Sequence, residues 1–260
     1  MRLKIVGSLF SVLPSLVVVS VLVSAALSQD GTPTTACSNA TLNGHYGVVI
    51  SGFAGSNILA SGGQITANGK GGVVGTWTIN INGSIATNVP LTGTYALGNG
   101  CTGHATLTPS GSVPTTFNII VDSGGNRIEL IVTETGQTQS GYALAQGAAT
   151  CSLAGVKGTW GWLQTEAFLI GVGPGAFIGQ MTLDGTGKLQ ARAVTESANG
   201  TIAAGLSGPG TYTMGSNCVG TLTIPGSQFQ TQPVIVNGGQ EMLAVGLQPN
   251  TVNYQTAIRQ

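Results

Sequence analysis

The fold is decided by two stretches of sequence that each occur twice in the chain. CSNATLNGHYG at residues 37–47 returns as CSLAGVKGTWG at residues 151–161. Between and after them, GTYALGNGCTG at residues 93–103 returns as GTYTMGSNCVG at residues 210–220. Motifs that repeat in the same order indicate two copies of one structural unit in tandem. We therefore expect a first domain over residues 37–147, a linker over 148–150 and a second domain over 151–260.

Each copy holds one early and one central cysteine, and these are the four cysteines of the 260-residue chain. Four cysteines allow three pairings. The repeat favours Cys37 with Cys101 and Cys151 with Cys218, because each bridge then closes a loop of similar length inside its own copy. Metal ligation is the weaker alternative, since no Cys-x-x-Cys or paired histidine accompanies the cysteines. We expect two disulfides, no metal and no other cofactor.

The N-terminus is typical of a secretory signal peptide. Arg2 and Lys4 precede an apolar run over residues 5–27, which ends in the small-x-small site Ala26-Leu27-Ser28. The alternative is an uncleaved membrane anchor, because the run is long enough to span a bilayer. We expect cleavage after a signal peptide over residues 1–28, with a linker over 29–36 and no membrane span in the mature chain. The expected location is therefore extracellular or periplasmic, or the cell surface if the segment is retained.

Composition favours an all-β fold. Only 6% of the residues are charged, whereas 42 are glycine, which suits tight turns and disfavours helices. Eight basic residues balance eight acidic ones, so the chain lacks the basic footprint that nucleic-acid binding requires. We expect no nucleic-acid partner.

Alternation of apolar and polar residues between turn signals predicts eight strands in the first copy. These are residues 45–53, 61–67, 73–81, 93–96, 103–108, 115–121, 127–133 and 140–145. Asn-Gly and Asp-Gly turns join such runs in both copies, and no long crossover interrupts them. An eight-stranded meander leaves no exposed edge when it closes, so we predict two tandem up-and-down antiparallel β-barrels. A pair of Greek-key sandwiches is the alternative.

The first predicted strand of the second copy carries a family resemblance. Gly158-Thr159-Trp160, and more loosely Gly44-His45-Tyr46, resembles the opening motif of the calycin barrels, the lipocalin and fatty-acid-binding superfamily. The resemblance implies a barrel in which a basic residue on the last strand covers the tryptophan, here Arg259 over Trp160. The first copy departs from this, since Ala145 stands where Arg259 would. The repeat as a whole also resembles domains of secreted bacterial proteins of unknown role, and allene-oxide-cyclase-like barrels are a comparable architecture.

The candidate ligand site lies in the second copy. Alternation places Trp160, Trp162, Gln164, Glu166 and Phe168 on one face of the first strand. If this face lines the barrel interior, Glu166 needs a partner, and we hypothesise that Arg192 on the third strand completes a polar anchor for a ligand. The alternative is that one or both of these side chains face solvent.

The segment over residues 169–178 follows that strand and is apolar and rich in glycine. We expect it to be a loop at the mouth of the barrel, with Phe177 at the ligand; the alternatives are a plug or a packing surface between the barrels. The candidate ligand-binding residues are therefore Trp160, Trp162, Glu166, Phe168, Phe177 and Arg192.

No catalytic constellation is shared by the two copies. His45 and His104 are replaced by Thr159 and Thr221 in the second copy, and no carboxylate pair occurs at the same place in both. We therefore expect a secreted, non-enzymatic protein that binds a small apolar ligand inside a barrel. The alternatives are a structural or adhesive protein with filled barrels, or a barrel isomerase or cyclase. Cavity volume distinguishes a binder from a filled barrel.

Overall fold

The computed structural model describes residues 36–149, 151–169, 173–226 and 229–260, of which 165–169 are described by their backbone alone. The predicted signal peptide lies outside the described residues. Within the described part of the chain, no helix has the length and the apolar character needed to cross a bilayer.

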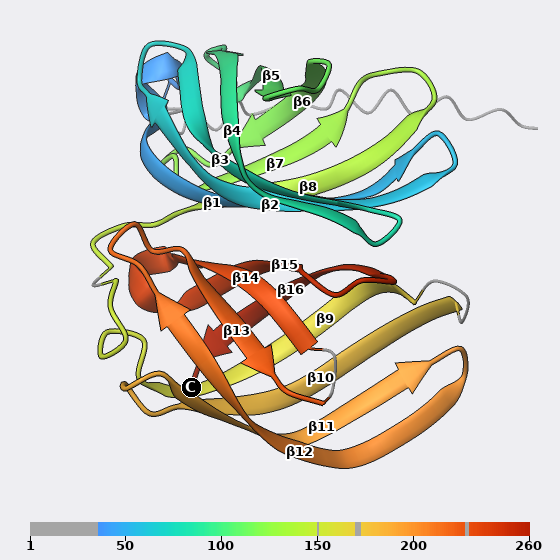
Figure 1. The fold of residues 1–260 in the computed structure, drawn as a ribbon. Helices are drawn as coiled ribbons and strands as arrows, with labels where there is room; N and C mark the ends of the chain where they lie inside the picture. Colours follow the sequence, from blue (N-terminus) through green and yellow to red (C-terminus); the bar gives the residue numbers. More distant parts are fainter. Residues whose placement is uncertain (1–35, 150, 170–172, 227–228) are drawn as a thin grey trace, which may run out of the picture. The chain divides into compact units, whose positions relative to one another are not determined.

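The chain forms two closed antiparallel barrels of eight strands each, as predicted (Figure 1). The strands of the first barrel are β1 (Asn43–Ala54), β2 (Asn57–Asn68), β3 (Gly72–Ile81), β4 (Ser84–Leu97), β5 (Thr102–Pro109), β6 (Thr115–Val121), β7 (Arg127–Val132) and β8 (Gln137–Ala145). The second barrel contains β9 (Gly158–Leu169), β10 (Gly173–Leu183), β11 (Lys188–Ala198), β12 (Thr201–Met214), β13 (Gly220–Ile224), β14 (Phe229–Val236), β15 (Glu241–Gly246) and β16 (Thr251–Arg259). Two short 3-10 helices, η1 (Asn39–Thr41) and η2 (Asn237–Gly239), complete the described elements.

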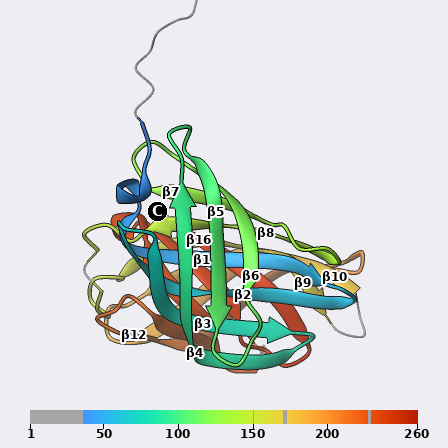
Figure 2. The same ribbon diagram turned by 90° about the horizontal axis from the view of Figure 1, so that it is seen from above.

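Each barrel closes because its last strand pairs with its first. Tyr46 on β1 lies opposite Ala145 on β8, and Trp160 on β9 lies opposite Arg259 on β16. Figure 2 shows the strands of the first barrel following one another around its wall. In both barrels each strand pairs with the strands next to it in the sequence, and the last strand pairs with the first, so the Greek-key alternative is wrong.

One predicted strand is much shorter than the observed one. We expect residues 93–96, whereas β4 begins at Ser84. Asn88 and Pro90 disfavour regular strand geometry, but β4 accommodates them through a register shift opposite Trp77–Ile79, where Asn88 adopts a φ of 56°. Pro90 lacks an N–H donor, yet its carbonyl still accepts a hydrogen bond from Ser110 N at 2.7 Å.

The repeated Cys and Gly-Thr-Tyr motifs close one end of each barrel. The predicted disulfides, Cys37–Cys101 and Cys151–Cys218, are both present. Beside the first, the Tyr95 hydroxyl lies 2.7 Å from Leu42 O and 3.0 Å from Asn39 O. In the second barrel the Tyr212 hydroxyl donates to Leu153 O at 3.1 Å. Each tyrosine therefore ties the segment that precedes the first strand to the end of its barrel.

The repeated Cys-x-Gly glycines are required by the close approach of two strands. A Cβ atom on Gly103 would lie 2.0 Å from Ala96 O, and one on Gly220 would lie 2.1 Å from Thr213 O. Neither position admits a side chain without a shift of the backbone. This explains why the motif keeps its glycine in both copies.

The two barrels lie in one compact unit and share an interface. The strands β1 and β2 contact β14, β15 and β16, and an apolar cluster that includes Val49, Ala60, Val236 and Val245 fills the contact. Asn80 is fully buried there, and its Nδ2 donates to Gly246 O at 3.0 Å and to Thr251 O at 2.7 Å. The barrels are therefore held together by apolar packing and by satisfied amide hydrogen bonds.

We expect replacement of Cys37 and Cys101 by serine to lower the free energy of unfolding of the first barrel by about 4 kcal/mol, because the unfolded loop regains its freedom. Urea unfolding followed by fluorescence measures this loss. The double serine variant at Cys151 and Cys218 should lose a similar amount in the second barrel, since the two loops span 64 and 67 residues. A loss below about 1 kcal/mol in both variants would contradict the expected role.

Tyr46 predicts a loss of stability at alkaline pH. Burial, with smaller contributions from Tyr95 and Asp122, raises the pKa of its phenol to about 12, above its ordinary value of 10.0. The fold therefore favours the neutral phenol, so this contribution to stability is present below pH 10.0 and is lost as the pH rises toward 12. Unfolding free energies measured across this range should fall less steeply for Tyr46→Phe than for the wild type. Equal slopes would contradict the prediction.

Candidate functional site

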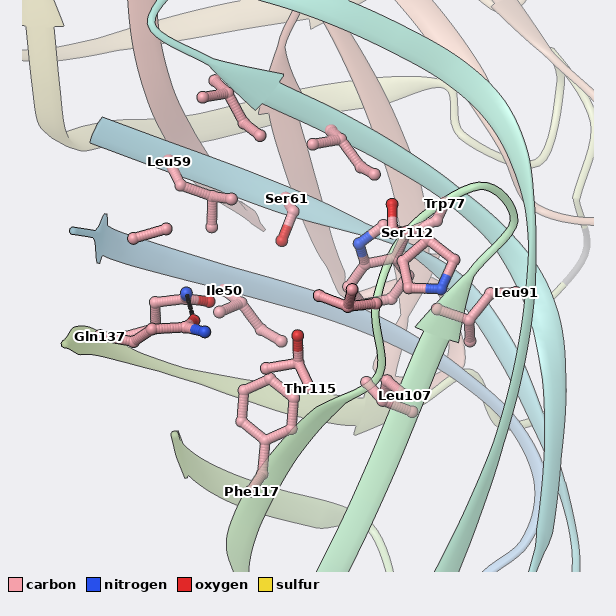
Figure 3. Close-up of a pocket in the computed structure, with 16 residues that line it drawn as sticks. Ile50, Leu59, Ser61, Trp77, Leu91, Leu107, Ser112, Thr115, Phe117 and Gln137 are labelled. Carbon is pink, nitrogen blue, oxygen red and sulfur yellow. Dashed lines mark hydrogen bonds between the residues drawn. The ribbon is translucent and has the colours of Figure 1, made fainter. Parts of the chain in front are cut away.

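An apolar cavity of about 360 Å³ lies inside the first barrel. It is at the end opposite the disulfide, because its lining includes Ala54, Ile81 and Val113 beside the hairpin turns of that end. Figure 3 shows side chains from several strands pointing into it. Most of the wall is formed by large apolar residues, among them Ile50, Trp77, Leu91, Leu107 and Phe117.

A few polar groups interrupt this wall. Ser61 is only 5% exposed, and its hydroxyl points into the cavity (Figure 3). Gln139 is 7% exposed, and its Nε2 donates to Gln137 Oε1 at 2.5 Å. Gln137 Nε2 in turn donates to Glu134 Oε2 at 2.7 Å. All residues that line the cavity belong to the described part of the chain, and none of them is ionisable.

The predicted tryptophans lie in the core of the second barrel. Trp160 is fully buried and Trp162 is 4% exposed, and Gln164 follows them on the same interior face, as the alternation predicts. The side chains of Glu166 and Phe168 lie outside the described residues. Phe177 is partly buried and packs against the same core. Arg192 is exposed and lies opposite Gln180 of β10 in the ladder.

The described interior of the second barrel is packed where these tryptophans lie. Trp162, Met181 and Met242 border a void of only about 10 Å³. The ladders show why the barrels differ: Ser61 lies opposite Ile50 in the first barrel, whereas Phe177 occupies the matching position opposite Gln164 in the second. A phenyl ring thus takes the place of a hydroxymethyl group.

The sequence reasoning therefore missed the residues that line the cavity of the first barrel. Ile50, Ser61, Trp77, Phe117 and Gln139 were not among the predicted site residues. The signal was present in the alignment of the two copies, where Ser61 stands against Phe177. A small residue at an interior position that is bulky in the duplicate indicates unfilled space.

The prediction of a loop over residues 169–178 is wrong for residues 173–178, which belong to a strand. β9 ends at Leu169 and β10 begins at Gly173, so Phe177 lies within a strand. The matching segment of the first barrel is a two-residue turn between Ala54 and Asn57. Gly55 allows this tight turn because it adopts a φ of 62°, a conformation that costs glycine little. Residues 170–172 lie outside the described residues.

The predicted contact between Arg259 and Trp160 is confirmed. Arg259 Cζ lies 5.5 Å from the centre of the Trp160 ring, and its Nη2 donates to Lys157 O. Trp160 Nε1 donates to Val156 O at 3.0 Å. In the first barrel Ala145 lies opposite Tyr46, whose hydroxyl donates to Gly125 O at 2.9 Å. Trp160 and Tyr46 therefore each fix a loop at the disulfide end of their own barrel.

The histidines are surface residues. His45 Nδ1 lies 2.8 Å from Thr66 Oγ1, and His104 Nδ1 lies 2.8 Å from Asn118 Oδ1, and both side chains are exposed. Neither lines the cavity. Among the described residues, no group of three or more His, Cys, Asp or Glu side chains gathers closely enough to hold a metal ion.

The carboxylate Asp184 has a structural role in a turn. Its Oδ1 accepts hydrogen bonds from Thr186 N at 2.7 Å and Lys188 N at 3.0 Å, as Asn68 Oδ1 does from Lys70 N and Gly72 N in the first barrel. Hydrogen bonds from Thr186 lower the pKa of Asp184 to about 2. The exchange of Asp for Asn between the copies is therefore explained by turn geometry.

Comparison with models of known protein families finds none that matches this sequence. Comparison with characterised proteins finds no match either. The geometry of the cavity therefore provides the evidence on function.

Arg259→Ala is expected to lower the free energy of unfolding of the second barrel by about 1–2 kcal/mol, because it removes the cation over Trp160 and the bond to Lys157 O. Arg192→Ala is the matched control, since Arg192 is exposed, and its effect should stay within about 0.5 kcal/mol. Denaturant unfolding measures both. Equal effects of Arg259→Ala and Arg192→Ala would show that the contact over Trp160 contributes nothing to stability.

Proposed function

We propose that the protein is a secreted, non-enzymatic binder of a small apolar ligand, which it holds in the cavity of the first barrel. The observation that carries this proposal is the apolar cavity of about 360 Å³. Sites for small molecules are usually apolar hollows of about 300–1,000 Å³ with a few polar groups, and this cavity falls within that range. An eight-stranded barrel is just wide enough to hold one small ligand, as in calycin-like proteins.

Binding is favoured over catalysis because the cavity supplies no acid or base. Its polar lining consists of hydroxyl and amide side chains such as Ser61, Thr115 and Gln139. An isomerase or cyclase commonly needs a titratable group within reach of the reacting atoms. Two disulfides are compatible with an exported protein, which supports the secreted part of the proposal.

The second barrel has a structural part in this proposal. Its described interior is packed around Trp160 and Trp162, and its strands β14–β16 contact β1 and β2 of the first barrel. Ile50 on β1 and Ser61 on β2 line the cavity from this side. The second barrel thus supports a wall of the site.

Ser61→Phe should fill the cavity and weaken the binding of an apolar probe such as butylbenzene by at least about tenfold. The substitution copies Phe177, which occupies the matching interior position of the second barrel. Isothermal titration calorimetry measures the affinity, and circular dichroism checks the fold. Thr76→Phe, which adds the same ring at an exposed position of β3, is the control and should bind as the wild type does. Unchanged binding in Ser61→Phe would refute the site.

A further inference from the structure

The hydrogen bonds at the mouth of the cavity form a directed chain. Glu134 Oε1 accepts from Thr116 N at 2.8 Å, and Glu134 Oε2 accepts from Gln137 Nε2 at 2.7 Å. Gln137 Oε1 then accepts from Gln139 Nε2 at 2.5 Å. Figure 3 marks this last bond between the two amides.

The carboxylate fixes the direction of both amides. An ionised carboxylate only accepts hydrogen bonds, so Gln137 must turn its NH₂ group toward Glu134 and its oxygen toward Gln139. Gln139 must then use one N–H of its own amide on Gln137, which leaves Gln139 Oε1 and the second N–H of this amide as the free end. No other described side chain or backbone group donates to this oxygen. The chain of hydrogen bonds therefore ends in an acceptor oxygen and one N–H, both on a residue that is more than nine-tenths buried.

Ser61 adds a second unpartnered polar group to the same cavity. Its hydroxyl points into the cavity (Figure 3). Among the described residues, none forms a hydrogen bond with it. Ser61 and Gln139 lie on β2 and β8, the two strands that flank β1. Their strands are about 10 Å apart across β1, and the two residues are offset by two positions, since Ser61 lies opposite Ile50 and Gln139 opposite Gly52. A ligand head group that bonds to both must therefore bridge the space between their side chains.

Charge excludes the common anionic amphiphiles. No cationic side chain lines the cavity. The nearest ion along this chain of hydrogen bonds is the Glu134 carboxylate. A ligand carboxylate would lose its hydration and gain no counter-ion. At about 30 Å³ for each non-hydrogen atom, the share that a water molecule takes in the liquid, the cavity admits on the order of a dozen such atoms.

We propose that the cavity selects a neutral hydroxyl compound, an aliphatic alcohol of about this size, whose O–H donates to Gln139 Oε1 and accepts from Ser61 Oγ. This assignment of the ligand class rests on the proposed function.

The test uses the mature protein and four probes of similar size: 1-decanol, decanoate, decylamine and butylbenzene. Calorimetry at neutral pH should show decanol bound about tenfold more tightly than decanoate or decylamine, the factor that corresponds to one hydrogen bond of about 1.4 kcal/mol. Gln139→Leu should weaken decanol binding about tenfold and leave butylbenzene within about twofold. Ser61→Ala should also weaken the binding of decanol.

The outcomes separate this inference from the function on which it rests. Tighter binding of decanoate or decylamine, or an equal loss of decanol and butylbenzene in Gln139→Leu, would overturn the ligand class while leaving a binding cavity. Failure of all four probes to bind would refute the proposed function itself. If Gln139→Leu does not fold, the wild-type series and Ser61→Ala still decide between a neutral and a charged ligand.

Discussion

The ladder between the first and last strand of each barrel is the constraint on which the rest of the structure depends. Once β1 pairs with β8, and β9 with β16, no edge remains open and every second residue must face the interior. The width of that interior is then set by the number of strands, and only side-chain size decides whether it is filled. A barrel with an interior cavity and a barrel that is packed around its tryptophans can therefore share one backbone plan, as the described parts of these two copies do.

The two ends of each barrel are under different constraints. At the disulfide end the two cysteines bond to each other, while the Gly-Thr-Tyr tyrosine and the Cys-x-Gly glycine meet backbone atoms, so the identity of these residues is fixed by geometry. At the opposite end the interior positions meet only one another. Substitution there changes the space inside the barrel without opening the ladder. This explains why the copies resemble each other around their cysteines and differ at Ser61 and Phe177.

Much of the fold was predictable from the sequence for the same reason. Turn residues, cysteine spacing and alternation predicted both barrels and both disulfides. The position of Arg259 over Trp160 was implied by the resemblance of Gly158-Thr159-Trp160 to a calycin motif. The location of the cavity was not predicted, because it depends on how side chains from separate strands fill a common volume. Aromatic residues drew attention to Trp160 and Trp162, although large side chains fill space as readily as they line it.

The interface between the barrels helps to explain why the first barrel tolerates a cavity. Unfilled space costs stability, since the atoms around it lose packing partners and the wall tends to collapse inward. Here β1 and β2 carry Ile50 and Ser61 on their inner face and the apolar contact with β14–β16 on their outer face. Buried amides such as Asn80 hold that contact in register. The second barrel thus limits inward movement of the wall that it touches, so any opening for a ligand must involve the hairpin turns at the mouth or the strands away from the interface.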